Sequence, residues 1–157
     1  MTEPANNMPV VLFRLDGQRC ALALSAVERV VRAVEITPLP KAPEIVLGVI
    51  NAQGQVIPVV DARRRFRLPA REPNPDDRFI IARTARRRVV LAADAVDGVR
   101  KLADHEMVRA EQALPFASYL QGVAKMEDGL ALIYDLDRFL SLDEERRLDA
   151  ALSGGHG

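Results

Sequence analysis

The chain repeats itself, and this repeat restricts the folds open to its 157 residues more than any other feature. A shift of 69 residues lays residues 11–31 over residues 80–100, and a shift of 74 lays residues 48–64 over residues 122–138. The matched pairs are Arg14 with Arg83, Arg19 with Arg88, Leu22 with Leu91, Ala23 with Ala92, Ala26 with Ala95, Val27 with Val96, Val30 with Val99, Gly48 with Gly122, Asp61 with Asp135 and Arg64 with Arg138. The chain therefore contains two similar units of one supersecondary pattern.

Each unit is predicted to run from a hairpin through a short capped helix and a connector to a second hairpin and a second capped helix. About 60 residues with short strands are too few for a two-layer sandwich, but they suffice for a small closed barrel that hides its strand edges. We therefore expect a mainly β fold. Two β-barrels, roughly residues 10–67 and 78–140, would pack together in one domain over residues 10–140, with short helices and a C-terminal helix. Strands can be exchanged between the barrels.

Alternating apolar residues locate the hairpins. Residues 10–24 alternate on both sides of a turn at residues 16–17, and residues 48–61 do so around a turn at residues 53–54. Both turns contain a glycine, which tolerates the positive φ that tight hairpin turns require. The corresponding turn of the second unit, residues 85–87, lacks glycine.

Polar residues ahead of short apolar segments predict helix starts. Ser25 precedes residues 26–32, so its hydroxyl is expected to cap a short helix there while Glu28 reaches back to the backbone of the cap residue. Asp61 stands where the second strand of its hairpin ends, and it is expected to cap the next helix. The cap residues expected in the second unit are Asp94, Asp97 and Asp135.

The remaining segments are expected to be connectors, a terminal helix and tails. Three prolines in residues 36–43 predict an extended connector, and the Pro-rich, polar residues 68–77 predict a mobile surface loop between the two lobes. Apolar spacing over residues 135–152 predicts a terminal helix that ends at the glycines beyond it. Residues 1–9 are expected to form a flexible tail, and residues 141–157 the helix end and a C-terminal tail.

Charge and cysteine content restrict the class of protein. The 22 basic and 22 acidic residues give a formal net charge of zero, which argues against binding of nucleic acid or an anionic membrane through the overall field. The single cysteine, Cys20, cannot form an internal disulfide and fits a reducing compartment. The sequence also lacks a secretion leader and a membrane-spanning apolar run, so we expect a cytoplasmic protein without membrane insertion.

Candidate catalytic residues are few. The chain has none of the glycine motifs that hold nucleotides or present a nucleophilic serine. His105 has acidic neighbours, but a solvated loop histidine is a simpler interpretation than a proton shuttle, and Cys20 fits core packing better than nucleophilic work. Asp61 and Asp135 fit capping better than paired catalytic carboxylates. We therefore expect no enzyme, no metal ion and no cofactor, and a small enzyme that uses His105 or Cys20 is a third hypothesis.

Two arginine clusters leave a nucleic-acid-binding module as the main alternative. Arg63, Arg64, Arg65 and Arg67 crowd a predicted short helix, and residues 86–88 lie at a predicted turn. The chain has only five Phe, two Tyr and no Trp, so it offers little surface on which bases could stack. Solvated faces and local salt bridges are therefore the preferred interpretation, and no nucleic-acid partner is expected.

Several segments, in one order and spacing, resemble the CheW family of chemotaxis coupling proteins. These segments read FRLDGQRCALAL, SAVERVVR, ITPLPKAP, GVINAQGQVIPVVDARRRF, RRVVLAADAVDGV and GVAKMEDGLALIYDLDRFL. The resemblance covers about residues 10–140. It implies two five-stranded, SH3-like β-barrels packed on one another, which agrees with the repeat.

The resemblance also implies a function without catalysis. CheW-like proteins are adaptors that bind the cytoplasmic tip of a chemoreceptor and the regulatory domain of a CheA-type histidine kinase, and they can form rings with one another and with that domain. The leading hypothesis is therefore a cytoplasmic scaffold in chemotaxis-like signal transduction, recruited to membrane-associated receptor arrays.

The family's receptor-binding groove can be carried over by position. It would use apolar residues near the junction of the lobes, with two glycines shaping the adjacent loop. The valines of this groove are Val27, Val30, Val96 and Val99, and the glycines are Gly48 and Gly54. Burial of the valines in the core is the competing interpretation.

Two positions depart from the family pattern. The hairpin turn usually reads NLRG, whereas residues 51–54 carry Gln53 in place of the arginine. The segment VxEV carries Arg29 where the glutamate is expected. An acid and a base that look like an ion pair on the partner-facing surface have thus been lost together, and a hydrogen bond between Arg29 and Gln53 could still hold the loop. Arg29 is either a specificity residue or an exposed residue near a helix C-terminus.

Overall fold

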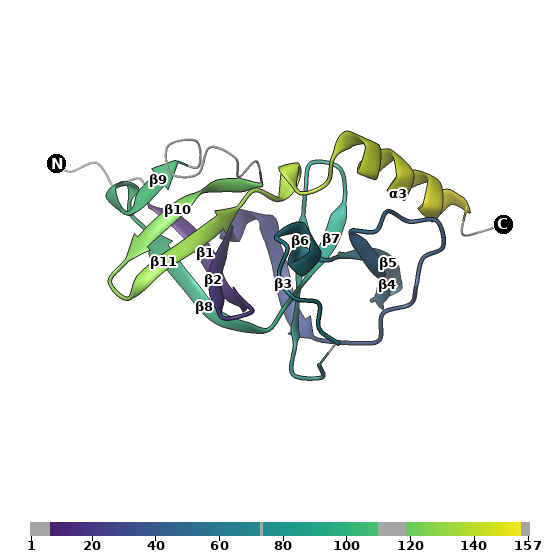
Figure 1. The fold of residues 1–157 in the computed structure, drawn as a ribbon, viewed down its shortest axis with the longest axis horizontal. Coiled ribbons are helices and arrows are strands. Elements are labelled where there is room, and N and C mark those ends of the chain that lie inside the picture. The colour runs from purple at the N-terminus through teal and green to yellow at the C-terminus, as the bar shows by residue number, and fades with distance from the viewer. Residues whose placement is uncertain (1–6, 73, 110–118, 155–157) are drawn as a thin grey trace.

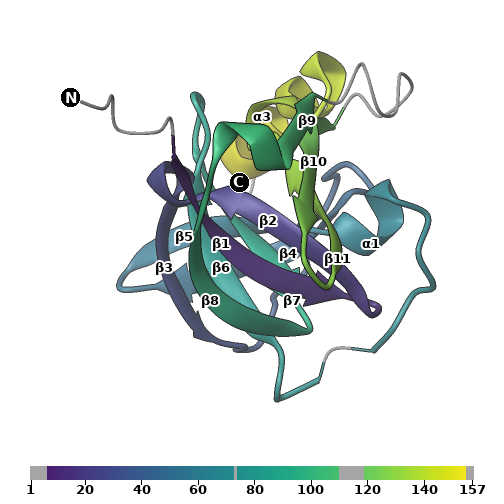
Figure 2. The ribbon, with the colours of Figure 1, turned by 90° about the vertical axis from the view of Figure 1, so that its left-hand side faces the viewer.

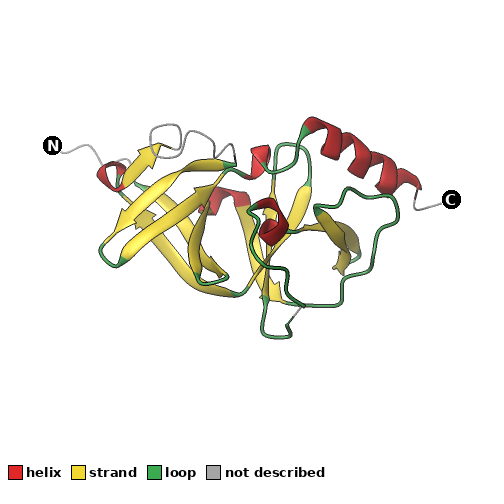
Figure 3. Ribbon diagram, viewed as in Figure 1, coloured by secondary structure: helices red, strands yellow, loops and turns green. Residues whose placement is uncertain are grey.

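The computed structural model describes residues 7–72, 74–109 and 119–154, and folds them into two β-sheets that lie side by side (Figure 1). The six-stranded sheet has the order β8-β1-β2-β11-β10-β9, and its strands are β1 (Met8–Leu15), β2 (Gln18–Ala23), β8 (Ala95–Leu102), β9 (Met107–Arg109), β10 (Leu120–Met126) and β11 (Gly129–Tyr134). The five-stranded sheet has the order β3-β6-β7-β5-β4, and its strands are β3 (Val27–Arg32), β4 (Val46–Ala52), β5 (Gln55–Val60), β6 (Arg78–Arg83) and β7 (Arg88–Ala93). Strands dominate the molecule (Figure 3), so the expected mainly β fold is confirmed.

Each sheet combines strands from both halves of the chain. In the six-stranded sheet β1 pairs with β8 and β2 pairs with β11, whereas in the five-stranded sheet β3 pairs with β6 and β5 pairs with β7. The pairings β2 with β11 and β5 with β7 are parallel, and the hairpin pairings are antiparallel. The two sequence repeats therefore interlock by exchanging strands, and neither half of the chain supplies a complete sheet.

Alternate residues of the central strands face two different cores. On β6, Phe79 and Ile81 pack in a cluster that belongs to the five-stranded sheet, whereas Ile80 and Ala82 join a cluster shared between both sheets. Phe13 of β1 packs in the shared cluster as well. Burial of each large apolar side chain stabilises the fold by about 1.5–3 kcal/mol. Because the shared cluster takes residues from both sheets, neither sheet can keep its core without the other.

The short helix expected over residues 26–32 is wrong, because Val27–Arg32 form the strand β3. A single 3-10 turn at Leu24–Ala26 precedes the strand, and no side chain, Ser25 included, caps it. The Glu28 side chain reaches arginines on β6 and β7 instead of the cap. Valine is restricted in helices by its branched Cβ and suits a pleated strand, so pairing with β6 outweighs the local capping pattern.

The second unit needs the same correction. β8 replaces the capped helix that was expected after Asp94. Asp94 accepts the backbone N–H of Asp16 at 2.8 Å, and Asp97 pairs with Arg14 at 2.9 Å. Both carboxylates therefore join β8 to the β1–β2 hairpin and cap no helix.

Two of the expected caps are confirmed. Asp61 accepts the Arg64 N–H at 3.1 Å and caps α1 (Ala62–Arg65). Asp135 caps the 3-10 turn at Leu136–Arg138, where it accepts an N–H two residues further on at 3.1 Å. The repeat at this position therefore reflects the same strand-to-helix turn in both units.

The hairpin turns are also as expected. Residues 16–17 have φ of 52° and 79°, and residues 53–54 have φ of 53° and 83°. The turn without glycine is held by Thr84, whose Oγ1 accepts the N–H groups of Arg86 and Arg87 at 3.1 Å each. A side-chain acceptor thus closes the turn where the sequence lacks glycine.

The terminal helix begins later than expected. After the 3-10 turn that Asp135 caps, Phe139 is 2% exposed and packs in the shared cluster. α3 then covers Leu142–Gly154. Ser141 and Glu144 form a capping box, because the Glu144 N–H donates to Ser141 Oγ at 3.1 Å and the Ser141 N–H donates to Glu144 Oε1 at 2.9 Å. The end of the 3-10 turn and the new capping box at Ser141 thus separate two helical pieces that apolar spacing alone joined.

α3 lies along the five-stranded side of the molecule (Figures 1 and 2). Leu148 is fully buried in the shared cluster. Two arginines hold the acidic side of the helix: Arg65 lies 2.5 Å from Glu144, and Arg87 lies 2.9 Å from Glu145. Neither α3 nor any other helix in the described ranges is long and apolar enough to cross a membrane.

Close backbone contacts explain why the repeat matches Gly48 with Gly122. Gly48 and Gly122 each follow a register shift in the first strand of a hairpin, where a third segment crosses closely. A Cβ atom on Gly48 would lie 2.3 Å from the carbonyl oxygen of Thr37, and one on Gly122 would lie 2.6 Å from that of Val108. Both glycines are therefore required by a close backbone approach.

Candidate functional site

β3 and β8 are edge strands of the two described sheets. Val30 of β3 and Val96 of β8 line one hollow of about 190 Å³, which we call the junction hollow. The other lining residues of the junction hollow are Asp76, Arg78, Asp94 and Ala95. The fold thus brings together two of the valines that the resemblance selected, although they are 66 positions apart in the chain.

The four valines of the expected groove fall into two kinds. Val99 is 61% exposed and Val30 is 37% exposed, so both are available to a partner. Val27 and Val96 are half-buried and pack against the shared cluster. Core packing therefore explains why valine occurs at positions 27 and 96. It does not explain the exposed valines Val30 and Val99.

Arg29 and Gln53 line a second hollow of about 280 Å³, which we call the turn hollow. The other residues of the turn hollow are Glu28, Ala52, Gln55, Ile57, Ile81 and Arg88. Both Arg29 and Gln53 are exposed, and no hydrogen bond joins these two described side chains. The structure brings the two departures from the family pattern to one surface without linking them directly.

A different charge pair occupies the turn hollow. Glu28 accepts Arg88 Nε at 2.8 Å and Arg83 at 3.5 Å, and Arg88 also donates to Gln55. The hydrogen bond from Arg88 lowers the pKa of Glu28 below its ordinary value. Glu28 is therefore committed to arginines of its own sheet, and exposed Arg29 forms no ion pair with an acid among the described residues. Sequence reasoning treated Glu28 as a capping residue, because its partners are far away in the chain.

The two glycines of the expected site have different roles. Gly48 is buried beneath Thr37 and lines neither hollow, so its role is in the fold. Gly54 is exposed at the tip of the β4–β5 turn, where its N–H donates to Asn51 Oδ1 at 3.0 Å. A Cβ atom on Gly54 would meet nothing within 4 Å, so the positive φ of 83° is what favours glycine there.

We expect coupling between Arg29 and Gln53 in partner binding. Gln53→Arg alone should weaken binding because it adds a positive charge to the hollow that Arg29 already lines, whereas Arg29→Glu combined with Gln53→Arg should recover it. An exposed pair contributes only about 0–1 kcal/mol, so the readout is binding preference and not melting temperature. A double-mutant cycle with a receptor-tip peptide measures the coupling. Strict additivity without a change of preference would identify the two residues as neutral drift.

The candidate catalytic residues are separated in the structure. Cys20 is buried in the shared cluster, and its thiol donates to Tyr134 Oη at 3.3 Å. Burial raises the pKa of the Cys20 thiol to about 11, so it stays protonated near neutral pH. His105 is exposed, and within the described ranges no group of three or more His, Cys, Asp or Glu could hold a metal ion. His156 lies outside the described residues.

The arginine clusters are largely paired with acids of the chain itself. Arg63 lies 2.6 Å from Asp94, and Arg64 lies 2.7 Å from Glu44. In the other cluster, Arg87 is bound to the acids of α3 and Arg88 to Glu28. Arginines that already hold carboxylates are poorly placed to neutralise phosphates, which favours the salt-bridge interpretation.

Asp94 stands at the centre of a charge network beside the junction hollow. Its carboxylate accepts Arg63 and Arg71 at 2.6 Å each and the Asp16 N–H at 2.8 Å. Burial alone would raise the pKa of Asp94, but the hydrogen bonds from Arg63, Asp16 and Arg71 outweigh it and lower the pKa. Arg71 also binds Asp77 at 2.8 Å, which anchors the segment that was expected to be a mobile loop. Sequence spacing gave no signal for this network.

Acid should weaken the attachment of α3. Burial raises the pKa of Glu144, but hydrogen bonds from Arg65 and Ser141 outweigh this and lower it below the ordinary value. The stabilisation is therefore complete above about pH 4.3 and is lost as the pH falls through the lower pKa of the folded state. Glu144→Gln should reduce the free energy of unfolding by about 1 kcal/mol at neutral pH and by less near pH 3, as measured by urea unfolding.

Glu44→Gln is the matched control for this prediction. Glu44 is also paired with an arginine, but the two side chains are 84% and 55% exposed, so its loss should change stability by less than about 0.5 kcal/mol. A Glu144→Gln effect that stays constant between neutral pH and about pH 3 would show that the carboxylate charge does not attach the helix.

Residues 9–144 match the family model for the CheW-like domain. The chain belongs to the CheW-like family. The chemotaxis protein CheW of Rhizobium meliloti is 31% identical over 137 residues, which cover 86% of this chain and 88% of that protein. The chemotaxis protein CheW of Thermotoga maritima is 27% identical over 140 residues, covering 89% of this chain and 92% of that protein.

A solved structure agrees with this membership. The scaffolding protein TtCheW from Thermoanaerobacter tengcongensis superposes with a TM-score of 0.79 at 28% identity, covering 88% of this chain and 95% of that chain. Protein FrzA of Myxococcus xanthus is 31% identical over 90 residues, or 57% of this chain and 56% of that protein. The CheW-like fold of two SH3-like barrels, expected from the resemblance, is thus confirmed.

Proposed function

We propose that this CheW-like protein is a cytoplasmic adaptor that couples chemoreceptor tips to the regulatory domain of a CheA-type histidine kinase. Its support is the match to the CheW-like domain over residues 9–144 and the similarity to proteins named for chemotaxis and for scaffolding. The protein acts by holding two partners together and performs no chemical step. Self-association into rings belongs to the same proposal.

The exposed valines on the two edge strands carry this proposal. Val30 of β3 and Val96 of β8 line the junction hollow. Val99 follows Val96 by three positions on β8, and both Val30 and Val99 expose apolar surface to solvent. A receptor tip is a helical hairpin, and an amphipathic helix binds by laying its apolar face into such a groove. The receptor would therefore bind where the two sheets meet.

Affinity purification of the tagged full-length chain from its native cells tests the proposal. We expect a chemoreceptor and a CheA-type kinase among the retained proteins. Retention on heparin at moderate salt, without a kinase or receptor partner, would support the nucleic-acid-binding alternative and contradict the adaptor role. If the wild-type chain showed enzymatic turnover, loss of that turnover in the variant Cys20→Ala or His105→Ala would support the enzyme hypothesis.

The kinase should bind a different surface, on the second sequence unit. Leu130 of β11 is 56% exposed and offers apolar surface far along the chain from the valines of β3. Leu130→Asp should weaken kinase binding by about tenfold or more while receptor binding is retained, since a transient interface buries on the order of 1,000–1,600 Å² and depends on a few apolar residues. Binding of both partners to the purified variant is measured by calorimetry.

Val56→Asp is the matched control, because Val56 occupies the position of Leu130 in the first unit, 74 residues earlier, and is 60% exposed. We expect it to leave the kinase affinity within about twofold. Loss of kinase binding only in variants of the first unit would overturn the assignment of this surface.

A further inference from the structure

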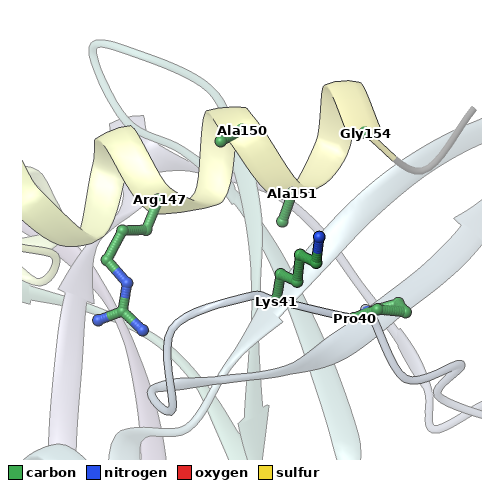
Figure 4. A pocket seen from close by; sticks show the side chains of 6 residues that line it. All are labelled: Pro40, Lys41, Arg147, Ala150, Ala151 and Gly154. Carbon is green, nitrogen blue, oxygen red and sulfur yellow. The ribbon is translucent and has the colours of Figure 1, made fainter. Parts of the chain in front are cut away.

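A hollow of about 440 Å³ separates the C-terminal half of α3 from a turn in the connector between β3 and β4 (Figure 4). Its lining residues are Pro40, Lys41, Arg147, Ala150, Ala151 and Gly154. In Figure 4 the Lys41 amine points toward the helix, and the Arg147 side chain extends from the helix toward the turn. Small residues of α3 therefore line the helix side of the hollow, and each side contributes one cation, Arg147 from the helix and Lys41 from the turn.

The turn places a lysine where glycine would be less strained. The Ala42 N–H donates to the Leu39 carbonyl oxygen at 3.3 Å, so Pro40 and Lys41 are the central residues of a tight turn. Lys41 has a φ of 69°, and a turn with proline followed by positive φ usually carries glycine or asparagine there. A long cationic side chain at this strained turn position indicates that the positive charge of Lys41 has a function.

The charges around the hollow are unbalanced. Two acidic residues of α3, Glu145 and Asp149, bind Arg87, and neither lines the hollow. Arg147 has only a long contact of 3.9 Å to Asp143, whose side chain is 80% exposed. Lys41 makes no ion pair with any acid in the described part of the chain. The hollow thus presents two cations without a strong internal counter-charge.

We propose that this hollow binds an acidic peptide segment of a partner protein. A carboxylate would lie between Lys41 and Arg147, and a neighbouring apolar side chain would contact Ala150 and Ala151. The hollow is large enough to admit such side chains, and charge-assisted hydrogen bonds to lysine and arginine are the strong ones. The hollow shares no lining residue with the junction hollow or the turn hollow, so the proposal does not depend on the adaptor function.

Titration of the ¹⁵N-labelled full-length chain with acetyl-Leu-Glu-Leu-Glu-amide tests the proposal. We expect saturable NMR shifts, centred on the amides of Lys41, Ala150 and Ala151, at peptide concentrations up to about 5 mM. The same peptide with glutamine in place of glutamate should cause no saturable shift. Lys41→Gly should weaken binding by about tenfold or more without lowering the melting temperature, because glycine suits the positive φ of the turn.

Arg146→Glu is the matched control for Arg147→Glu. Both arginines are exposed on α3, but Arg146 does not line the hollow. Arg147→Glu should weaken peptide binding by about tenfold or more, and Arg146→Glu should change it by less than about twofold. Equal effects of the two variants, equal binding of the glutamine peptide, or no saturable shift would overturn the proposal. Shifts of these amides by phosphatidylserine vesicles but not by the peptide would overturn it in favour of a lipid surface.

Discussion

Val99→Asp should weaken binding of a receptor-tip hairpin by about thirtyfold while the protein keeps its cooperative unfolding transition. Val99 is 61% exposed on an edge strand, so a charge there disturbs no core packing. A central apolar contact in an interface is worth about 2 kcal/mol, and an aspartate facing an apolar helix would lose it. Affinity is measured by calorimetry and stability by urea unfolding of the same variant.

Leu142→Asp is the control for this prediction. Leu142 is 52% exposed, but it lies on α3, whereas Val99 lies on β8, three residues after Val96 of the junction hollow. It should leave the affinity within about twofold, because the new charge is outside the proposed groove. If Val99→Asp leaves the affinity unchanged, or weakens it no more than Leu142→Asp does, the receptor surface lies elsewhere.

Gly48→Ala should destabilise the protein by about 3 kcal/mol or more. The added methyl group would lie 2.3 Å from the Thr37 carbonyl oxygen and 2.7 Å from Ile36 Cγ2, so the connector must move away from β4. That movement would break the two hydrogen bonds of 2.8 Å between Thr37 and Val49. Urea unfolding of the full-length variant measures the loss.

Two other glycines are the controls for the close approach. Gly122→Ala would place its methyl group 2.6 Å from the Val108 carbonyl oxygen and should destabilise by a similar amount. Gly54→Ala meets no atom within 4 Å and should lose only about 1 kcal/mol through its positive φ. If Gly48→Ala lowers the free energy of unfolding no more than Gly54→Ala does, the close approach of the connector is not the reason for glycine at position 48.

The hairpins could be predicted from the sequence because their information is local. Alternation over residues 10–24 and the turn at residues 16–17 reflect one strand pair, and both are found in β1 and β2. The caps at Asp61 and Asp135 are likewise set by neighbours within three residues. Contacts of this range are encoded directly in residue order.

Strand exchange and the nature of β3 depend on distant partners. The spacing of Ser25 and Glu28 favours a cap locally, but pairing of β3 with β6 and the ion pair of Glu28 with Arg88 decide the structure. The repeat identifies equivalent strands without showing that β1 pairs with β8 of the other unit. An equivalence between strands does not specify their neighbours.

The candidate site was predicted only in part for the same reason. The valines were selected by resemblance, yet which of them face solvent depends on the two cores: Val99 is exposed, and Val96 packs against the shared cluster. The charge network of Asp94 joins Arg63 and Arg71 from separate segments, so no motif shows it. Burial and long-range charge pairing are decided by the folded structure.

A reconstitution with purified proteins tests the adaptor proposal most directly. Receptor-tip hairpins are fixed on beads, and the regulatory domain of the CheA-type kinase is added with or without the CheW-like chain. We predict that the kinase domain is retained well above background only when the chain is present, and that Val99→Asp abolishes this retention. Equal retention of the kinase domain in the absence of the chain, or no retention in its presence, would contradict the proposal.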